Sequence, residues 1–366
     1  MKKILFVSPT LGNGGAERVM LYLMNYFSAR PDKYEISLLL IRREGNDYLT
    51  DLSDKIKVYR LGLDNRRIRY CIPTVIKSII IIRPTICFVG LFDLNIALAF
   101  FLPVMKMFKI HFIVRETNII SRKYHKNKLL RLGYRLFYNL YDRIIAQSKD
   151  MQEDLIENWG INPKRVRLVN NPIPIESVQE RSLNSCPIQM DSNQYNFVVI
   201  GKFSPQKGYD ILLKRLSELS RENQYHLYVL GSGKLQLQIE EWIVEYGLKC
   251  YVTLLGFHSN PYPYIKAADS LVLSSRYEGF PNVLLEANAL GKPVFVNCCK
   301  GGINEIVVNG VNGTIADFTS PEEFKKAYDR HLNTNFDEKI IKQMTSERYS
   351  CKNILPIYES VINSFR

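Results

Sequence analysis

Short apolar runs alternate with amphipathic stretches along almost the whole chain, and this alternation restricts the fold more than any other feature. Strands that alternate with helices are typical of parallel sheets whose two faces are both covered. Eleven runs are strand candidates: Ile4–Ser8, Glu35–Ile41, Thr85–Gly90, His111–Glu116, Arg143–Ser148, Val166–Asn171, Phe197–Phe203, His226–Gly231, Val252–Phe257, Leu271–Ser275 and Pro293–Cys298. We therefore expect an α/β protein with doubly wound parallel sheets.

The length of the chain favours two domains. A chain of 366 residues is long for a single hydrophobic core. The stretch Pro172–Gln194 has three prolines, many polar residues and no clear period, which is typical of a linker. We expect one domain at residues 1–175 and a second at 176–349. A last periodic stretch, about Ile354–Phe365, predicts a terminal helix with no strand after it.

The positive charge is concentrated in the first half of the chain. Residues 1–180 contain 29 Lys and Arg against 17 Asp and Glu, whereas residues 181–366 contain 20 against 19. Such a split indicates an anionic partner for the first half. No helix-turn-helix, zinc knuckle or RNA-binding aromatic signature accompanies it. We therefore expect an anionic membrane surface as a partner, and no nucleic acid.

Several features indicate a cytoplasmic protein without a membrane span. The seven cysteines include no C-x-x-C pair, and adjacent cysteines such as Cys298 and Cys299 make poor disulfides, so reduced thiols are expected. The N-terminus is apolar for only about five residues before Pro9, which favours a first strand over a secretion signal. The run Ile96–Met105 is too short to span a bilayer. We expect peripheral association with the inner face of the cell membrane.

The stretch Lys123–Arg143 predicts a basic amphipathic helix. Its cations alternate with leucines and aromatic residues, and they are Lys123, Lys126, Lys128, Arg131, Arg135 and Arg143. Such a helix can lie in the headgroup region of a membrane. The same pattern also fits a helix whose apolar stripe faces its own sheet while the cations are solvated. Both interpretations stay open at this point.

The segment EGFPNVLLE places two carboxylates, Glu278 and Glu286, between two strand candidates. In open parallel sheets, ligands bind where a loop leaves the carboxyl end of a strand. A helix is expected to begin near Asn282 as its N-cap, and its free N–H groups and dipole favour phosphate. One carboxylate can hold a ribose diol and the other a sugar. Two glutamates at this spacing also arise by chance, but the Gly-Phe-Pro-Asn between them favours a nucleotide-sugar site.

Two further loops follow strand candidates. In IGKFSPQKG, Lys202 and Lys207 stand at one strand-to-helix corner and suit the two charges of a diphosphate. In PTLGNGGAER, Gly14 and Gly15 precede a helix expected from about Ala16, so that the backbone can approach a ligand closely. This first loop alone is weak evidence for any one ligand.

Together these segments resemble the retaining glycosyltransferases of family 4, which have the GT-B architecture of two Rossmann-like domains facing a cleft. The resemblance is strong over Gly201–Asp317 and moderate over the first domain. It implies that the terminal helix, about residues 350–366, returns to the first domain. It also implies a donor site made of Gly14, Gly15, Lys202, Lys207, Phe257, His258, Glu278, Gly279, Phe280, Pro281, Asn282, Val283 and Glu286.

The chain departs from the family pattern at two places. Lys202 stands where the family usually has arginine, which keeps the charge but loses the two-pronged fork. At FIVRETN, many family members have a histidine that touches the transferred sugar, and none stands here. We choose Glu116 for that position. The resemblance further implies acceptor-side roles for Glu17, Arg18, Arg115 and Asn118.

The sequence is thus interpreted as a retaining, metal-independent hexosyltransferase. It would move a sugar from a nucleotide-diphosphate donor, expected to be UDP-linked, to an oligosaccharide or polyprenyl-diphosphate-linked acceptor of capsule, lipopolysaccharide O-antigen or glycoprotein synthesis. The catalytic candidates are Glu278, Lys202, Lys207 and Glu116. No Asp-x-Asp triplet is present, so neither a metal nor another cofactor is expected. The alternatives are another GT-B enzyme, such as a sugar-nucleotide epimerase or a phosphorylase, and a non-catalytic basic binding protein.

Overall fold

The chain divides into two compact units. The computed structural model describes residues 1–366 except Asn13, Asn65, 125–127, 220–224 and Arg366. Unit 1 comprises Met1–Pro172 and Cys351–Arg366, and unit 2 comprises Ile173–Ser350. The boundaries expected from the sequence, after residue 175 and at about residue 350, lie within a few residues of this division.

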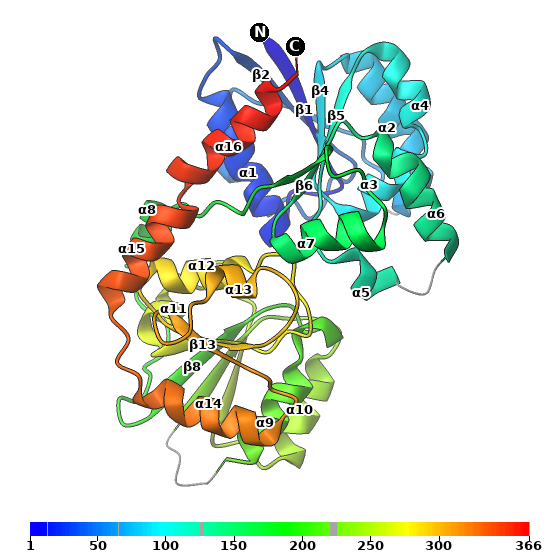
Figure 1. Cartoon of the computed structure of the whole chain (residues 1–366). Coiled ribbons are helices and arrows are strands. Elements are labelled where there is room, and N and C mark those ends of the chain that lie inside the picture. Colours follow the sequence, from blue (N-terminus) through cyan, green and yellow to red (C-terminus); the bar gives the residue numbers. More distant parts are fainter. Residues whose placement is uncertain (13, 65, 125–127, 220–224, 366) are drawn as a thin grey trace. The chain divides into compact units, whose positions relative to one another are not determined.

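Unit 1 is built on a seven-stranded sheet in which all strands are parallel, with the order β3-β2-β1-β4-β5-β6-β7 (Figure 1). The strands are β1 (Lys2–Ser8), β2 (Tyr34–Leu40), β3 (Lys57–Arg60), β4 (Ile86–Val89), β5 (His111–Arg115), β6 (Arg143–Ala146) and β7 (Val166–Leu168). The helices are α1 (Gly15–Ser28), α2 (Ile68–Ile82), α3 (Phe92–Ala99), α4 (Leu102–Met105), α5 (Ile120–Tyr124), α6 (Lys128–Phe137), α7 (Lys149–Glu153) and α16 (Cys351–Asn363). Short 3-10 turns at Asp47–Asp51, Lys106–Phe108 and Tyr138–Leu140 and a π turn at Asp154–Asn158 complete it.

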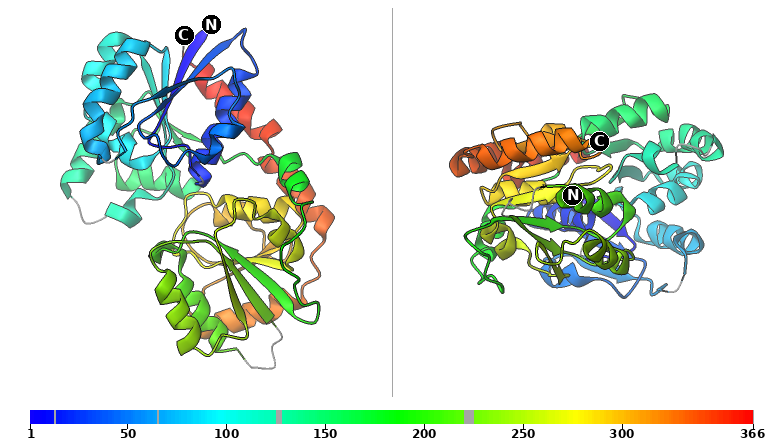
Figure 2. Two further views of the ribbon diagram at one scale, coloured as in Figure 1. Left: turned by 180° about the vertical axis from the view of Figure 1, so that it is seen from behind. Right: turned by 90° about the horizontal axis from the view of Figure 1, so that it is seen from below.

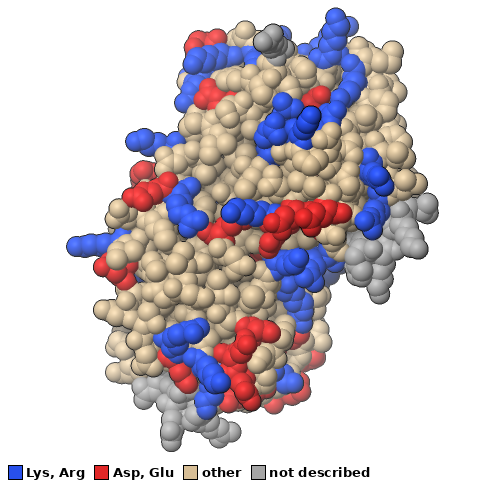
Figure 3. Space-filling view, viewed as in Figure 1, with Lys and Arg blue, Asp and Glu red and all other residues tan. Residues whose placement is uncertain are grey.

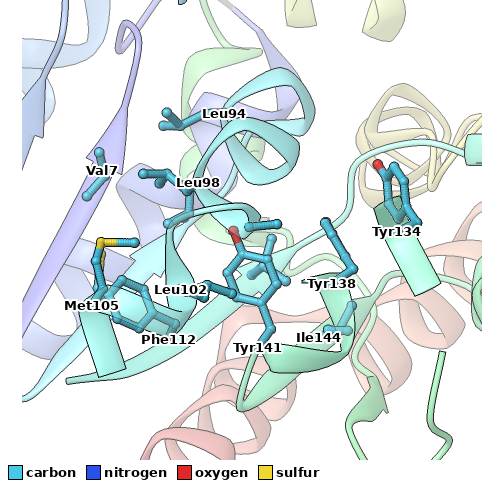
Figure 4. Close-up of a cluster of buried hydrophobic side chains, with 14 of the residues drawn as sticks. Val7, Leu94, Leu98, Leu102, Met105, Phe112, Tyr134, Tyr138, Tyr141 and Ile144 are labelled. Atoms are coloured by element: carbon cyan, nitrogen blue, oxygen red, sulfur yellow. The ribbon is translucent and has the colours of Figure 1, made fainter. Parts of the chain in front are cut away.

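Both faces of the central strands of this sheet are buried, which explains why those strands are mostly apolar. Alternate residues of β1 enter different cores: Leu5 and Val7 pack with α2, α3 and α6, whereas Phe6 packs with α1 and α16. Figure 4 shows part of the first core, in which side chains of α3, α4, β5 and β6 gather. The left view of Figure 2 shows helices on either side of the sheet of unit 1.

Unit 2 has the same construction around a six-stranded parallel sheet of order β10-β9-β8-β11-β12-β13. Its strands are β8 (Tyr195–Ile200), β9 (Tyr225–Leu230), β10 (Val252–Gly256), β11 (Ser270–Leu273), β12 (Val294–Asn297) and β13 (Gly313–Ala316). Its helices are α8 (Ile175–Arg181), α9 (Tyr209–Ser217), α10 (Gln236–Glu245), α11 (Tyr262–Ala267), α12 (Asn282–Ala289), α13 (Ile303–Ile306), α14 (Pro321–Asn333) and α15 (Glu338–Tyr349), with a 3-10 turn at Pro205–Lys207. One core packs beneath α8, α11, α12 and α13, and the other beneath α9, α10 and α14.

The expectation of doubly wound parallel sheets is therefore confirmed, and all eleven strand candidates contain a strand. Two edge strands, β3 and β13, were not expected from the sequence. The stretch Pro172–Gln194 is not a featureless linker, because α8 occupies Ile175–Arg181 and packs into a core of unit 2. Its residues Ile175 and Val178 are buried, and this supplies the apolar contact that a short helix needs.

The strand orders define where a ligand site can form. In each sheet the chain winds first to one side and then to the other, and the reversal lies between β1 and β4 in unit 1 and between β8 and β11 in unit 2. Ligands of open α/β sheets bind at the carboxyl ends of the strands beside such a reversal. The loops that leave β1, β8 and β11 are therefore the first places to examine.

Candidate active site

The strand reversal of unit 2 brings a lysine and a glutamate together. Lys207 follows β8 and Glu278 follows β11, and the Lys207 Nζ lies 2.6 Å from the Glu278 Oε1. The Ser275 hydroxyl donates to the same carboxylate oxygen at 2.5 Å. The lysine side chain is 21% exposed and the glutamate side chain 9% exposed, so the pair lies at a partly buried edge that a ligand can reach.

Hydrogen bonds join the two loops and hold this geometry. The Ser274 hydroxyl donates to the Lys207 carbonyl at 2.8 Å, and the Arg276 N–H donates to the Gln206 carbonyl at 2.8 Å. The Gln206 side chain donates in return to the Tyr277 carbonyl at 3.0 Å. These hydrogen bonds connect the two loops, and the position of Lys207 depends on residues from both.

A forked ion pair adds to this connection. The two terminal nitrogens of Arg276 donate to the two carboxylate oxygens of Asp210 on α9, at 3.0 and 2.6 Å. Arg276 also donates to the Pro205 carbonyl at 2.7 Å. The hydrogen bonds that Arg276 donates to Asp210 raise the pKa of Arg276. This contact was not foreseen from the sequence, because Arg276 and Asp210 meet only once the order of the strands is known.

Two glycines are required by close backbone contacts at the site. Gly208 has a φ of +64°, and a Cβ there would lie 2.2 Å from the Ser274 carbonyl oxygen. Gly301 has a φ of +130°, and a Cβ there would lie 2.3 Å from the Glu278 carbonyl oxygen. L-residues rarely adopt such backbone angles. Gly301 thus packs directly against the backbone of Glu278.

Helix α12 begins directly after this loop. Asn282 is its first helical residue and not its N-cap, which corrects the sequence-based expectation: Pro281 occupies the cap position and offers no side-chain oxygen. The Leu284 N–H donates to the Pro281 carbonyl at 3.1 Å, and the dipole at this end of the helix favours an anion. Glu286 lies one turn further and is 5% exposed. Phe280 is buried, whereas Val283 is partly exposed.

The remaining donor-side candidates differ in their surroundings. Phe257 follows β10 and its side chain is 53% exposed, so its ring can stack on a planar group. His258 is held by its neighbours instead: its Nε2 lies 3.1 Å from the Leu255 carbonyl oxygen, and the Tyr264 hydroxyl lies 3.2 Å from the ring nitrogens. Lys202 is exposed, and within the described residues no ion pair or side-chain hydrogen bond of Lys202 is present.

The first loop of unit 1 leads from β1 into α1. Gly14 is the N-cap of α1 and Gly15 its first residue, one position earlier than expected, and both are exposed. A Cβ on Gly14 would lie 2.2 Å from a carboxylate oxygen of Glu17, so this side chain folds over the glycine. The Arg18 Nε donates to the Tyr48 hydroxyl at 2.8 Å. These residues thus lie together at the carboxyl end of β1.

Glu116 and Arg115 form a buried polar cluster, and this argues against direct contact with a sugar. Both side chains are 0% exposed. The Asn95 amide donates to the Glu116 Oε1 at 3.0 Å, and the Tyr138 hydroxyl donates to the same oxygen. Arg115 donates to the Asn171 Oδ1 at 2.5 Å and to the Tyr358 hydroxyl of α16 at 3.3 Å. The choice of Glu116 for the missing histidine is therefore corrected: its side chain faces the interior.

The environment of Glu116 changes its ionisation. Burial raises the pKa of Glu116 to about 8, although the hydrogen bond from Asn95 and the charge of Arg115 lower it. Within the described residues the Glu116 Oε2 has no hydrogen-bond partner, which agrees with a protonated carboxyl. Asn118 lies beyond the strand end and is partly exposed, and its side chain accepts from the Ile119 N–H at 2.9 Å.

The arrangement in unit 2 suits an anionic ligand with hydroxyl groups. Lys207 and the start of α12 supply positive charge, and the Glu278 and Glu286 carboxylates supply acceptors close by. Among the described residues, no group of three or more His, Cys, Asp or Glu side chains is placed to hold a metal ion. The exposed aromatic ring of Phe257 completes a set of groups that can contact phosphate, hydroxyl and base.

Two doubly wound parallel-sheet units in one chain, with such a site at the strand reversal of the second, give this chain the GT-B architecture. Comparison with known families agrees with this architecture. Residues 13–177 match the model of glycosyltransferase family 4, and residues 184–347 match the model of glycosyl transferases group 1. The chain belongs to the family 4 type of GT-B glycosyltransferases.

Two individual relatives and one solved structure show how similar the chain is to known proteins. An uncharacterised glycosyltransferase of Methanocaldococcus jannaschii is 27% identical over 65% of the chain, and the match spans 61% of that relative, less than two thirds of its length. The N-acetylgalactosamine-N,N'-diacetylbacillosaminyl-diphospho-undecaprenol 4-alpha-N-acetylgalactosaminyltransferase of Campylobacter jejuni is 27% identical over 84% of the chain and 83% of its own. The crystal structure of Anabaena HepE in complex with UDP and glucose has a TM-score of 0.79, covers 100% of both chains and is 19% identical, so it supports the fold alone.

Proposed function

We propose that the protein transfers a sugar, with retention of the anomeric configuration, from a UDP-linked donor to a polyprenyl-diphosphate-linked glycan. The observation that carries this proposal is the contact between Lys207 and Glu278 beside the start of α12. A nucleotide diphosphate needs positive charge at its phosphates and acceptors for its ribose hydroxyls, and these groups stand within two adjacent loops and one helical turn.

The proposed chemistry centres on the leaving diphosphate. As the glycosidic bond breaks, negative charge grows on the phosphate oxygen, and we assign Lys207 and the start of α12 to stabilise that charge. Groups that bind the transition state more strongly than the ground state accelerate the reaction. Glu278 fixes the lysine through the short ion pair and accepts from hydroxyl groups of the donor sugar. Lys202, which is exposed nearby in the same loop, adds a second cation.

Retention is proposed to follow front-face attack. In this scheme Glu278 holds Lys207 and accepts from the donor sugar, and no carboxylate is assigned as the nucleophile of a double displacement. The acceptor hydroxyl would then attack on the side from which the diphosphate leaves, with the phosphate oxygen taking its proton. A divalent metal is not required in this scheme, because the cations and the helix start supply the positive charge.

The donor and acceptor classes rest on the relatives. The name of the Campylobacter relative describes transfer to a diphospho-undecaprenol-linked sugar, and the HepE complex contains UDP. The excess of positive charge in residues 1–180 suits a lipid diphosphate at an anionic membrane. We propose peripheral association with the inner face of that membrane. None of the described helices is both long and apolar enough to cross a bilayer.

A donor screen tests the proposal. UDP-linked hexoses and N-acetylhexosamines are each incubated with a polyprenyl-diphosphate-linked sugar, and the product is scored by its gain in mass. The anomeric configuration of the product is then read from its proton coupling constants. We expect one UDP-sugar to give a product with retained configuration. Epimerisation of the free donor or phosphorolysis of a glycan, without transfer, would favour the other GT-B activities, and an inverted product would overturn the mechanism.

A further inference from the structure

Exposed apolar side chains gather in one region of unit 1. Among the described residues, 17 large hydrophobic side chains are exposed, and nine of these lie between residues 66 and 141. They are Tyr70, Ile81, Phe100, Phe101, Val104, Met107, Phe108, Leu132 and Leu136. Five of the nine belong to one short segment, Phe100–Phe108, and such a concentration marks an interaction site more often than a plain solvated face.

The segment Phe100–Phe108 has apolar side chains both in the core and on the surface. Leu102 and Met105 are buried, and Figure 4 shows them in the core beside Phe112. The side chains of Val104 and Met107 are exposed to solvent instead, by 56% and 79%. The inward residues fix the segment to the fold, so the outward residues form a stable feature of the surface.

Helix α6 extends this surface. The Phe100 ring lies 5.0 Å from the Phe137 ring of α6, and a Cβ on Gly133 would contact Phe100 at 3.4 Å. On the same helix, Leu132 and Leu136 are spaced four residues apart and are both exposed, so they share one face. We call Phe100, Phe101, Val104, Met107, Phe108, Leu132 and Leu136 the apolar surface.

The charges around the apolar surface are almost all positive. Residues 66–142 contain 14 Lys and Arg against three acidic residues, Asp93, Glu116 and Asp142. Arg115 and Glu116 are fully buried, and Asp142 pairs with Lys106 at 3.1 Å. Arg131 and Arg135 are exposed on α6 beside its two leucines, and Lys109 is exposed after Phe108. Figure 3 shows mainly uncharged surface, interrupted by blue side chains, over α2 and α4. Apolar side chains bordered by cations match the boundary between acyl chains and anionic headgroups.

We propose that the apolar surface inserts into the interface of an anionic lipid bilayer. The inference rests on the proposed function, because it names the part of unit 1 that meets the membrane of a lipid-linked acceptor. It assigns the insertion to Phe100–Phe108 with Leu132 and Leu136, and it gives Arg131 and Arg135 the task of attracting headgroups. The cations Lys126 and Lys128, which the sequence also suggested, carry no part of this argument, because Lys126 and the side chain of Lys128 lie outside the described residues.

Vesicle sedimentation with matched variants tests the insertion. The variant Val104→Ser with Met107→Ser is compared with Leu237→Ser with Val244→Ser, whose parent side chains on α10 of unit 2 are 74% and 57% exposed. With vesicles of phosphatidylcholine and phosphatidylglycerol, we expect the first pair to weaken binding by roughly tenfold or more. The second pair should bind like the parent protein. Equal binding by all three proteins would overturn the proposal.

Two further measurements report how deeply Met107 enters the bilayer and separate electrostatic attraction from insertion. Tryptophan emission of Met107→Trp should shift to shorter wavelength with vesicles and be quenched by bromine-labelled acyl chains, whereas Leu237→Trp should not respond. The pair Arg131→Gln with Arg135→Gln should weaken binding to anionic vesicles and remove much of its salt dependence. An unchanged Met107→Trp spectrum, or burial of Met107 in a concentration-dependent dimer without vesicle binding, would show that a protein and not a membrane covers this surface.

The two proposals fail in different ways. Calorimetric titration with UDP should give the same affinity for the parent and for Val104→Ser with Met107→Ser, because these residues lie outside the donor site. If no sugar is transferred from any UDP-linked donor to a lipid-linked acceptor but the vesicle results are as expected, the proposed function is wrong and the insertion surface is still supported. If transfer occurs and the serine variants bind vesicles like the parent, the insertion surface falls alone.

Discussion

The Lys207 ammonium lies 2.6 Å from the Glu278 carboxylate, although 71 positions separate the two residues in the chain. The contact exists because β8 and β11 are neighbours in the sheet and the chain reverses its winding between them. An ion pair at a strand reversal, beside the start of a helix, keeps a cation in a fixed position without a ligand. A lysine held in this way needs little reorganisation when a phosphate arrives.

Replacement of Lys207 by alanine should lower the rate of transfer much more than it lowers stability. The loss of one donor aimed at the developing charge costs about 10²–10³-fold in kcat in comparable sites. Lys207→Arg should retain part of the activity, because the charge remains while its geometry changes. Steady-state kinetics with saturating donor, together with thermal melts, measure both effects.

Lys214→Ala is the matched control for this experiment. Lys214 is an exposed lysine on α9 of the same unit, and its removal should leave kcat unchanged. A Lys207→Ala protein with a normal kcat and a raised KM would contradict the role in the transition state. In that case the lysine would contribute to ground-state binding of the donor only.

The sequence predicted most of the strands but not the contacts that build the site. The central strands are apolar on both faces and therefore easy to find, whereas the edge strand β3 has the sequence KVYR with exposed ends and gives almost no signal. The ion pair of Arg276 with Asp210 depends on which strands are adjacent, and one sequence does not contain that order. Glu116 was misjudged because strand-end position does not tell whether a side chain turns outward or inward.

Glu286→Ala should weaken binding of UDP by roughly a hundredfold or more. Glu286 lies one turn into α12, and we propose that its carboxylate accepts from the ribose hydroxyls, each charged hydrogen bond contributing about 1.5–3 kcal/mol. Calorimetric titration of the folded variant measures the change. The Gln variant, which keeps one acceptor oxygen and the side-chain volume, should lose less. Unchanged nucleotide affinity in a folded Glu286→Ala protein would remove this residue from the donor site.

Activity should survive the removal of divalent metal ions. In the proposed mechanism, Lys207, Lys202 and the N–H groups at the start of α12 stabilise the leaving diphosphate. We expect the same transfer rate before and after treatment with EDTA. A glycosyltransferase with an Asp-x-Asp metal site, assayed in parallel, should lose its activity and serve as the control. Loss of transfer that added Mg²⁺ or Mn²⁺ restores would contradict the metal-free mechanism.

The buried carboxyl of Glu116 should make the protein less stable as the pH rises. In the unfolded chain this group loses its proton near its ordinary pKa of 4.5, whereas in the folded protein the pKa is about 8. Between these values the folded state binds one more proton, so the free energy of unfolding falls with increasing pH and levels off above about pH 8. The total effect is on the order of a few kcal/mol. Thermal melts from pH 5 to pH 9 measure it.

Glu116→Gln isolates this contribution because glutamine cannot ionise. Its side-chain oxygen can still accept from the Asn95 amide and from the Tyr138 hydroxyl, so the buried cluster stays intact. The stability advantage of the variant over the parent should therefore grow from pH 5 to pH 8. Glu153→Gln, which alters an exposed glutamate of α7, should follow the parent profile at every pH. If Glu116→Gln also follows the parent profile, Glu116 is ionised in the folded protein, and the charge of Arg115 offsets its burial.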